Sequence, residues 1–417
     1  MSLRAPGPAH RRLTQAEVDQ ICARHAWLWQ RKPGGARAVF SWCDLSGLNL
    51  AGRELSDADF TAAILSDTNL SGAVLDQSIL FCADLQSANL EKASLRRADL
   101  RGACLRGAIL QGADLFECDL REGALAIPDH ATGLSYIEVA HREAEAVAAN
   151  LRGANLERSK LSGIQAFKAD FTDAVMKSAK LVRANLKQAV LENVDFGGAD
   201  LSGANLTGAN LKNAVLTGTK TTAWQIDKAD MRGAVLDPPP ADHPKQASYA
   251  DRLSAHVHWV RSQGEQGQPS QFHGADLRGA GTLAGLNLTA LQAKGAVFYG
   301  LDLSGAQLQG AMLEEADLRT CNLTGADLRG ARLGRAKLDG ATLDRAKLGP
   351  LMLEGGRKFP SDLAQARLRS ASLKGADLSD ANLRESDLSQ ADLTGATLRQ
   401  TDLSGAITRA TRGLPES

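Results

Sequence analysis

Aromatic side chains are scarce in this sequence. They make up 4% of its 417 residues, although 43% of the residues are hydrophobic. The apolar fraction therefore comes chiefly from leucine and alanine, which predicts a lean and uniform core in place of one built on large rings. Proline is also rare, at 12 residues, and the 40 glycines follow no three-residue period. Neither a collagen helix nor a disordered proline-glycine tract fits this composition.

An excess of one charge, paired cysteines and long apolar runs are missing as well. The 48 basic and 48 acidic residues cancel, so the basic surplus of a nucleic-acid binder is absent. The six cysteines form no CxxC pair, which argues against a disulfide framework or a zinc site. No stretch approaches the roughly 18 apolar residues of a membrane span, and the basic N-terminus lacks the apolar segment of a secretory signal. We therefore expect a cytoplasmic protein that neither inserts into membranes nor binds nucleic acid directly.

An internal repeat of five residues dominates the chain. Every fifth residue from Phe40 to Leu125 is leucine or phenylalanine. A small residue often stands two positions earlier and aspartate or asparagine one position earlier, as in ADLQSANLEKASLRRADLRGA at 83–103. The pattern resumes in a new frame at Leu151 and again around Leu277, where it slips by one residue before continuing. Such long self-similarity is typical of a repeat architecture.

A period of five fits neither an α-helix nor a plain strand. A helix turns by about 100° per residue, so five residues would rotate successive leucines by about 140° and spread them around the helix. A chain that turns a corner every five residues would instead point every leucine inward. Aspartate, asparagine and glycine suit such corners, and the glycines two positions after the leucines can take a positive φ.

These A-(D/N)-L-x-x units resemble the pentapeptide-repeat family over about 40–125, 149–236 and 275–406. The resemblance implies an all-β solenoid, a right-handed quadrilateral β-helix with four units per coil and the leucines at its centre. Each coil would bury about four leucines, at roughly 1.5–3 kcal/mol each. A coil cannot bury its own ends, so stability would come from stacking neighbours.

Short segments interrupt the repeat, and we expect them to be α-helical. Each opens on serine or threonine followed three positions later by an acidic residue, which is a helix-start signal, and then shows a helical apolar stripe. These segments are 13–29, 135–148 and 248–260. Each precedes a leucine ladder, so each helix either covers the open start of a solenoid or recognises a partner.

The expected organisation follows from these boundaries. It comprises an N-terminal helical cap at 1–37, a first ladder at 38–127, a helical insert at 128–148, a second ladder at 149–236, a proline-rich linker with a helical insert at 237–272, a third ladder at 273–408 and a tail at 409–417.

No catalytic, cofactor or metal site is predicted. His256 and His258 form an HxH pair, but no carboxylate or cysteine nearby completes a metal site. The sequence has no phosphate-binding loop and no nucleophile elbow. The candidate residues are therefore ones that could contact a protein partner, namely Trp27, Trp29, Phe81, Phe116, His256, His258 and Trp259.

A non-enzymatic protein-binding scaffold of the bacterial cytoplasm is the leading functional hypothesis, with self-association through the C-terminal coil as an option. Some members of the family imitate B-DNA and bind DNA gyrase, and the acidic stretch at 43–90 favours this alternative while the zero net charge opposes it. The order of a His/Trp helix, a glycine loop and repeats resembles modules of accessory proteins in bacterial type VI secretion. An enzyme with its site in an insert is the fourth class.

Overall fold

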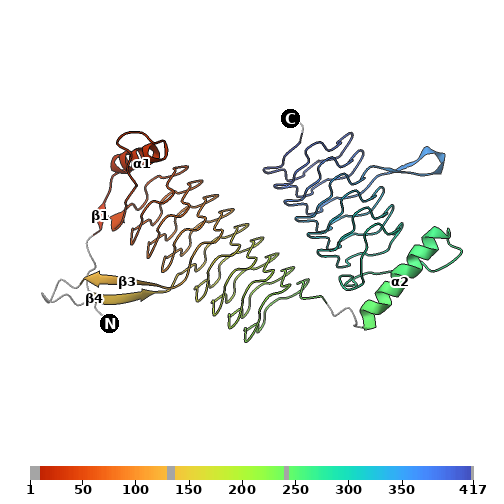
Figure 1. Ribbon diagram of the computed structural model, residues 1–417, viewed down its shortest axis with the longest axis horizontal. Coiled ribbons are helices and arrows are strands. Elements are labelled where there is room, and N and C mark those ends of the chain that lie inside the picture. The colour runs from red at the N-terminus through yellow and green to blue at the C-terminus, as the bar shows by residue number, and fades with distance from the viewer. Residues whose placement is uncertain (1–9, 129–136, 239–243, 415–417) are drawn as a thin grey trace. The chain divides into compact units, whose positions relative to one another are not determined.

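The computed structural model describes residues 10–128, 137–238 and 244–414 of the chain. The chain divides into two compact units, Met1–Asp237 and Pro238–Ser417, and each contains its own solenoid (Figure 1). Within a unit, residues twenty positions apart form parallel β-bridges, as Asn49 does with Asn69 and Asn69 with Asn89. One turn of the solenoid is therefore made of four five-residue sides.

Leucine and alanine fill the interior as the repeat predicts. Leu45, Leu50 and Leu55 are fully buried, and so are the small residues two positions before most central leucines. Phe40 and Phe60 stack at 5.0 Å between ring centroids in consecutive coils. At Ile164 and Ala166 the large and small positions are exchanged and both side chains stay buried, which conserves the packed volume.

The corners depend on positive φ angles two positions after each central residue. Gly47 has a φ of 70° there, and Asp57 takes the same conformation with a φ of 61°. The aspartate or asparagine before the central leucine supports the turn, because its side chain accepts a hydrogen bond from the backbone two residues later. Asp44 Oδ1, for example, accepts from the Ser46 N–H at 2.9 Å. Such local bonds explain why these residue types recur at the corners.

Unit 1 begins with strand β1 (Arg11–Arg12) and helix α1 (Gln15–Trp29), which lie against the first coil. β1 pairs in parallel with β2 (Cys43–Asp44). Thr14 caps α1 and forms with Glu17 the reciprocal capping box that the sequence predicts. Val18 and Cys22 of α1 are buried in the same core as the leucines, so the helix closes the first coil.

The prediction of a helix at 135–148 is wrong for residues 137–148, which the structure describes. Residues 129–136 lie outside the described part. β3 (Gly123–Pro128) and β4 (Ile137–Arg142) form an antiparallel hairpin in which Leu125 pairs with Ala140 (Figure 1). Cys104 then bridges to Glu145, so the solenoid continues past the hairpin. The ladders expected at 38–127 and 149–236 therefore stack in one solenoid, because antiparallel pairing lets a segment leave a coil and return beside its point of departure.

Unit 2 begins with α2 (Pro244–Arg261), which starts four residues earlier than the expected helix and takes in part of the expected linker. Proline is favourable in the first turn of a helix, where its missing N–H costs nothing. Leu253 and Val257 are buried with Phe272, so α2 closes the first coil of unit 2. A slip of one residue follows, since Asp276 bridges to Val297 and not to the residue twenty positions later.

A second hairpin interrupts the ladder expected to run unbroken over 273–408. It contains β5 (Leu351–Met352), a short 3-10 turn (Glu354–Gly356) and β6 (Lys358–Phe359). The two strands are antiparallel, and Lys347 bridges to Asp377, thirty residues later. The insertion is ten residues long, or two repeats, so the five-residue spacing hides it.

Candidate functional site

Apolar side chains fill the solenoid interiors where the structure describes them. In the described part of the chain, no group of three or more histidine, cysteine, aspartate or glutamate side chains could hold a metal ion. Burial raises the pKa of the Cys22 thiol to about 11 and that of Cys321 to about 12. These thiols stay protonated at neutral pH and are core side chains, not nucleophiles.

Side chains and β1 satisfy several backbone groups at the N-terminal edge of unit 1. The Arg11 N–H donates to the Trp42 carbonyl at 3.2 Å, as a preceding coil would. The side-chain amide of Gln15 then takes the place of a strand: its Nε2 donates to the Asn49 carbonyl at 2.9 Å, and its Oε1 accepts from the Asn49 N–H at 2.8 Å. The edge is thereby shielded from pairing with other strands at Trp42 and at Asn49.

A buried histidine fastens each helix to its solenoid. His25 Nδ1 accepts a hydrogen bond from the Ala38 N–H at 3.0 Å, and His256 Nδ1 accepts from the Ser270 N–H at 3.2 Å. In both units the donor lies two residues before the first core phenylalanine, Phe40 or Phe272. Burial lowers the pKa of each histidine from its ordinary value, which favours the neutral ring that this bond requires.

Trp27 and Trp29 are exposed at the C-terminal end of α1. Their exposed fractions are 42% and 51%, and Leu28 between them is 46% exposed. Large aromatic side chains on a surface are frequent contact points for protein partners. These two predicted residues therefore lie together where a partner could reach them.

The residues predicted on α2 have different surroundings. His256 is buried and serves as the fastening residue, so its side chain is not available to a partner. Its ring lies 5.7 Å from that of Trp259, which is half-buried. His258 is exposed. Of the predicted residues in this helix, His258 and the accessible part of Trp259 can contact other molecules.

The predicted outward phenylalanines are half-buried under arginines. The Arg101 guanidinium lies 5.2 Å from the centroid of the Phe81 ring. Phe116 is flanked by Arg96 at 4.6 Å and Arg158 at 5.7 Å. These cation–π contacts cover much of the two rings with charge, so each phenylalanine lies within a mixed surface and not in an apolar patch.

Acidic residues of the 43–90 stretch have local structural roles. Asp59 and Asp84 accept hydrogen bonds from backbone N–H groups two residues later, at 2.9 and 3.1 Å. Further along unit 1, acids pair with arginines: Asp99 holds Arg101 at 2.7 Å. Such exposed pairs contribute at most about 1 kcal/mol each. Corner formation thus accounts for Asp44, Glu54, Asp59 and Asp84 of the acidic stretch without a partner.

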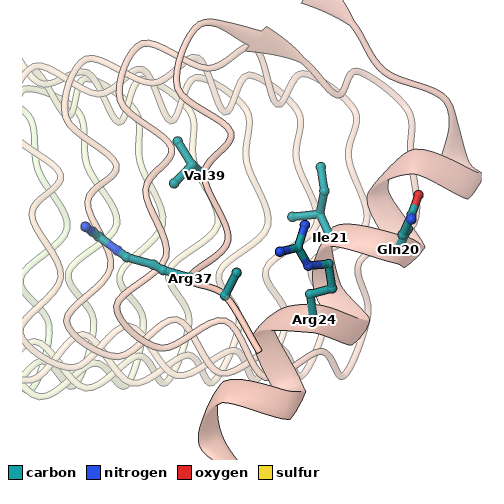
Figure 2. A pocket seen from close by; sticks show the side chains of 6 residues that line it. Gln20, Ile21, Arg24, Arg37 and Val39 are labelled. Atoms are coloured by element: carbon teal, nitrogen blue, oxygen red, sulfur yellow. The ribbon is translucent and has the colours of Figure 1, made fainter. Parts of the chain in front are cut away.

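A pocket that sequence reasoning missed lies between α1 and the first coil of unit 1. Its volume is about 270 Å³, and it is lined by Gln20, Ile21, Arg24, Ala36, Arg37 and Val39 (Figure 2). Ile21 and Arg24 extend from the helix on one side, whereas Arg37 and Val39 belong to the start of the coil. The signal available in the sequence was the pair of arginines that flank the loop between helix and ladder.

The stacked five-residue sides define a repeat protein of the solenoid class. The family model of pentapeptide repeats matches more than half of the chain, at residues 38–77, 83–121, 149–188, 179–218, 282–319, 316–349 and 361–400. The chain therefore belongs to the pentapeptide-repeat family, as its repeat units predict. A comparison with curated proteins finds no significant match.

Several solved structures are similar to this chain. HetL, a pentapeptide repeat protein involved in heterocyst differentiation regulation from the cyanobacterium Nostoc sp. strain PCC 7120, is 24% identical, with 94% of this chain and 97% of HetL covered and a TM-score of 0.20. Full-length QnrB1, a plasmid-mediated fluoroquinolone resistance protein, is 20% identical over 51% of this chain and 94% of QnrB1, with a TM-score of 0.24. These scores are too low to support an argument about function. No helix in the described residues has the length and apolarity to cross a membrane.

Proposed function

We propose that this protein is a non-enzymatic scaffold that binds protein partners through its exterior. The observation that carries the proposal is the exposed cluster of Trp27, Leu28 and Trp29 on the helix that closes unit 1. Leucine and alanine occupy the interior, which leaves the outer surface and the helices for recognition. Exposed tryptophans adjoining a rigid element are suited to anchor a partner.

Affinity capture with the full chain tests this proposal. A double variant, Trp27→Ser with Trp29→Ser, should lose captured partners that the wild-type protein retains after chemical crosslinking. Ile109→Ser is a matched control, because Ile109 is an exposed hydrophobic residue elsewhere on unit 1, with 40% exposure. Equal capture by the double variant and the wild type would show that the tryptophans are not the contact. Turnover of a substrate that a single point variant abolishes would overturn the non-enzymatic assignment.

The identity of the captured protein decides between the narrower roles that the sequence predicts. A spike or effector protein that depends on the tryptophans would assign the role in type VI secretion. A gyrase subunit, together with inhibition of supercoiling by the purified chain, would assign the role of a DNA mimic.

Self-association through the C-terminal coil is part of the same proposal. Ile407 is 53% exposed there, and Leu398 and Leu403 are only partly buried. Apolar side chains at an open solenoid end are suited to pair with a second copy. Sedimentation of the wild type and of Ile407→Ser should then give different oligomeric states, whereas two identical monomers would exclude pairing at this end.

A further inference from the structure

The pocket beside α1 contains an open β-edge. In a solenoid interior, the residue before a central side chain donates its N–H to the preceding coil, and its carbonyl accepts an N–H from that same coil. Asp59 shows the pattern: its N–H donates to the Ala38 carbonyl at 3.0 Å, and its carbonyl accepts from the Phe40 N–H at 2.6 Å. Val39 occupies the equivalent position in the first coil. Neither its N–H nor its carbonyl has a hydrogen-bond partner among the described residues.

The cap of unit 2 closes the equivalent edge. Gln271 precedes Phe272 as Val39 precedes Phe40, and the Arg252 guanidinium donates a hydrogen bond to the Gln271 carbonyl. The same guanidinium lies 4.7 Å from the centroid of the Phe272 ring. In unit 2, Arg252 thus bonds the carbonyl whose equivalent in unit 1, that of Val39, has no partner among the described residues.

The fastening histidines make the two caps directly comparable. Arg252 lies four residues before His256, and the residue four before His25 is Ile21, which is too short and apolar to reach a carbonyl in the same way. The apolar Ile21 side chain lines the pocket and leaves the carbonyl of Val39 open. One difference between the two caps therefore lies at this helical position.

Two arginines accompany this open edge, and unit 2 has neither of them. Arg24, one residue before His25, corresponds to Ala255, and Arg37, three residues before Phe40, corresponds to Pro269. Arg24 donates from Nε to the Gly34 carbonyl at 3.3 Å, and Arg37 donates from Nε to the Asp57 carbonyl. Both guanidiniums are thus held in place by neutral acceptors. Among the described residues Arg24 forms no ion pair, whereas the charge of Arg37 helps to lower the pKa of Asp59.

We propose that the pocket between α1 and the first coil binds an extended acidic peptide segment of a protein partner. The backbone of that segment takes the place of a preceding coil side. One of its carbonyls accepts from the Val39 N–H, and the N–H two residues later donates to the Val39 carbonyl, as Ala38 and Phe40 do for Asp59. A carboxylate on the segment pairs with Arg24 or Arg37, since guanidinium–carboxylate hydrogen bonds are strong and directional. Addition of a strand to an exposed edge is a common mode of peptide recognition.

Charge and volume favour this occupant. The only ionisable side chains that line the pocket are the two arginines, so a basic segment is disfavoured. A pocket of about 270 Å³ holds a short piece of peptide and not a folded domain. The inference rests on the proposed scaffold function only in that a protein is bound at the exterior. It uses residues other than Trp27 and Trp29.

Titration of a fluorescent peptide into the full chain tests the inference. The probe is a capped five-residue peptide of alternating threonine and glutamate, and its glutamine counterpart is the control. The glutamate peptide should bind saturably, and the glutamine peptide should bind at least about fivefold more weakly, because hydrogen bonds between charged groups are stronger than those of a neutral amide. Hydrogen exchange of the Val39 amide should slow when the glutamate peptide is bound.

Ile21→Arg is the decisive variant, because it places at this edge the residue that closes unit 2. This variant should bind the glutamate peptide at least about fivefold more weakly, and hydrogen exchange at the Val39 amide should be slow even without peptide. Ala23→Arg is the matched control: it adds the same charge to an exposed position of α1 that does not line the pocket. Both variants must melt within a few degrees of the wild type, and Arg24→Ala with Arg37→Ala supplies a second test that introduces no large side chain.

Several results would overturn the inference. They are the absence of saturable binding, equal binding of the two peptides, unchanged affinity in both Ile21→Arg and the double arginine variant, or unchanged exchange at Val39. Self-association of the wild type that Ile21→Arg abolishes would assign the edge to a second copy of this chain instead. Because Trp27 and Trp29 are not altered, failure here leaves the capture experiment on the tryptophans intact.

Discussion

His25 accepts a hydrogen bond through Nδ1 from the backbone N–H of Ala38, at 3.0 Å, and so joins α1 to the start of the solenoid that it covers. His256 makes the same bond to the N–H of Ser270 in unit 2, at 3.2 Å. A ring nitrogen accepts a hydrogen bond only when it carries no proton. Both helices are therefore fastened by neutral histidines, which links the attachment of the caps to pH.

Acidification should loosen the caps. Burial lowers the pKa of His25 and His256 from the ordinary value of 6.5, so below this pH the unfolded chain takes up protons that the folded chain resists. The contribution of the neutral rings to stability is full above about pH 6.5 and falls as the pH drops toward the folded pKa. We expect a lower thermal midpoint at pH 5 than at pH 7.5 in melts followed by circular dichroism. The lowered pKa values of carboxylates such as Asp59 affect stability only below about pH 3.8.

His256→Gln removes one of these titrating rings and keeps a hydrogen-bond acceptor at the helix. The difference between the melts at pH 7.5 and pH 5 should shrink in this variant. His258→Gln removes an exposed histidine from the same helix and should leave the difference unchanged. A full pH response in His256→Gln would mean that the buried ring does not couple the cap to pH.

The interior of the solenoid could be predicted because its rule is local. Leucine at every fifth position and a small residue two positions earlier fix which side chains point inward, and Leu100 and Ala98 are buried accordingly. The hairpin of β3 and β4 could not be predicted in this way. The apolar residues from Ile137 onward suit a helix, but backbone pairing with residues 123–128 makes them a strand.

The candidate site likewise has one part that the sequence predicts and another that it does not. The exposure of Trp27 and Trp29 follows from their place outside the repeat, where no coil covers them. The pocket depends on a contact that is absent: Ile21 does not reach the edge that Arg252 closes in the other unit. That difference becomes visible only when the helix, the loop and the first coil are placed in space.

The inward and outward positions should differ sharply in their tolerance of charge. Leu100 is completely buried between the coils, so Leu100→Asp places an unpaired carboxylate in the core and should destabilise unit 1 by about 4 kcal/mol or more. Arg101→Asp removes the pair with Asp99 and sets two acids side by side at a partly exposed position, which should cost about 1 kcal/mol. Urea denaturation of the two variants measures both values, and equal midpoints would contradict the assignment of the interior.

Alanine variants of Gly330 and Gly325 distinguish two contributions to the free energy of unfolding: the strain of a positive φ and a close contact of the added Cβ. Both glycines have positive φ angles, of 66° and 65°. A Cβ on Gly325 would meet open space, whereas a Cβ on Gly330 would lie 2.8 Å from the Leu351 Cβ and 3.0 Å from the Phe359 ring. Gly325→Ala should therefore cost about 1 kcal/mol from the backbone alone. Gly330→Ala should cost more and speed amide exchange in residues 351–359, and equal losses in the two variants would show that the hairpin does not rest on this corner.

The hairpin of β5 and β6 should be dispensable for the solenoid, provided that the five-residue spacing is kept. Deletion of residues 351–360 joins Pro350 to Ser361 and places Leu363 five positions after Leu348. Ser361 is already buried as the small residue of its repeat, and its Oγ donates to the Gly349 carbonyl at 3.1 Å. Because Leu351 pairs with Phe359, the two ends of the deleted segment are neighbours, so the chain can close without stretching.

The shortened chain should melt within a few degrees of the wild type and keep its β-rich circular dichroism spectrum. Deletion of residues 352–359 is the matched comparison, because it removes a similar length but places Leu363 seven positions after Leu348. That spacing turns the next side of the coil out of register, so this variant should lose cooperative melting of unit 2. If both deletions behaved alike, the fold of this unit would not depend on the five-residue period, and the stacking of its coils would need another cause.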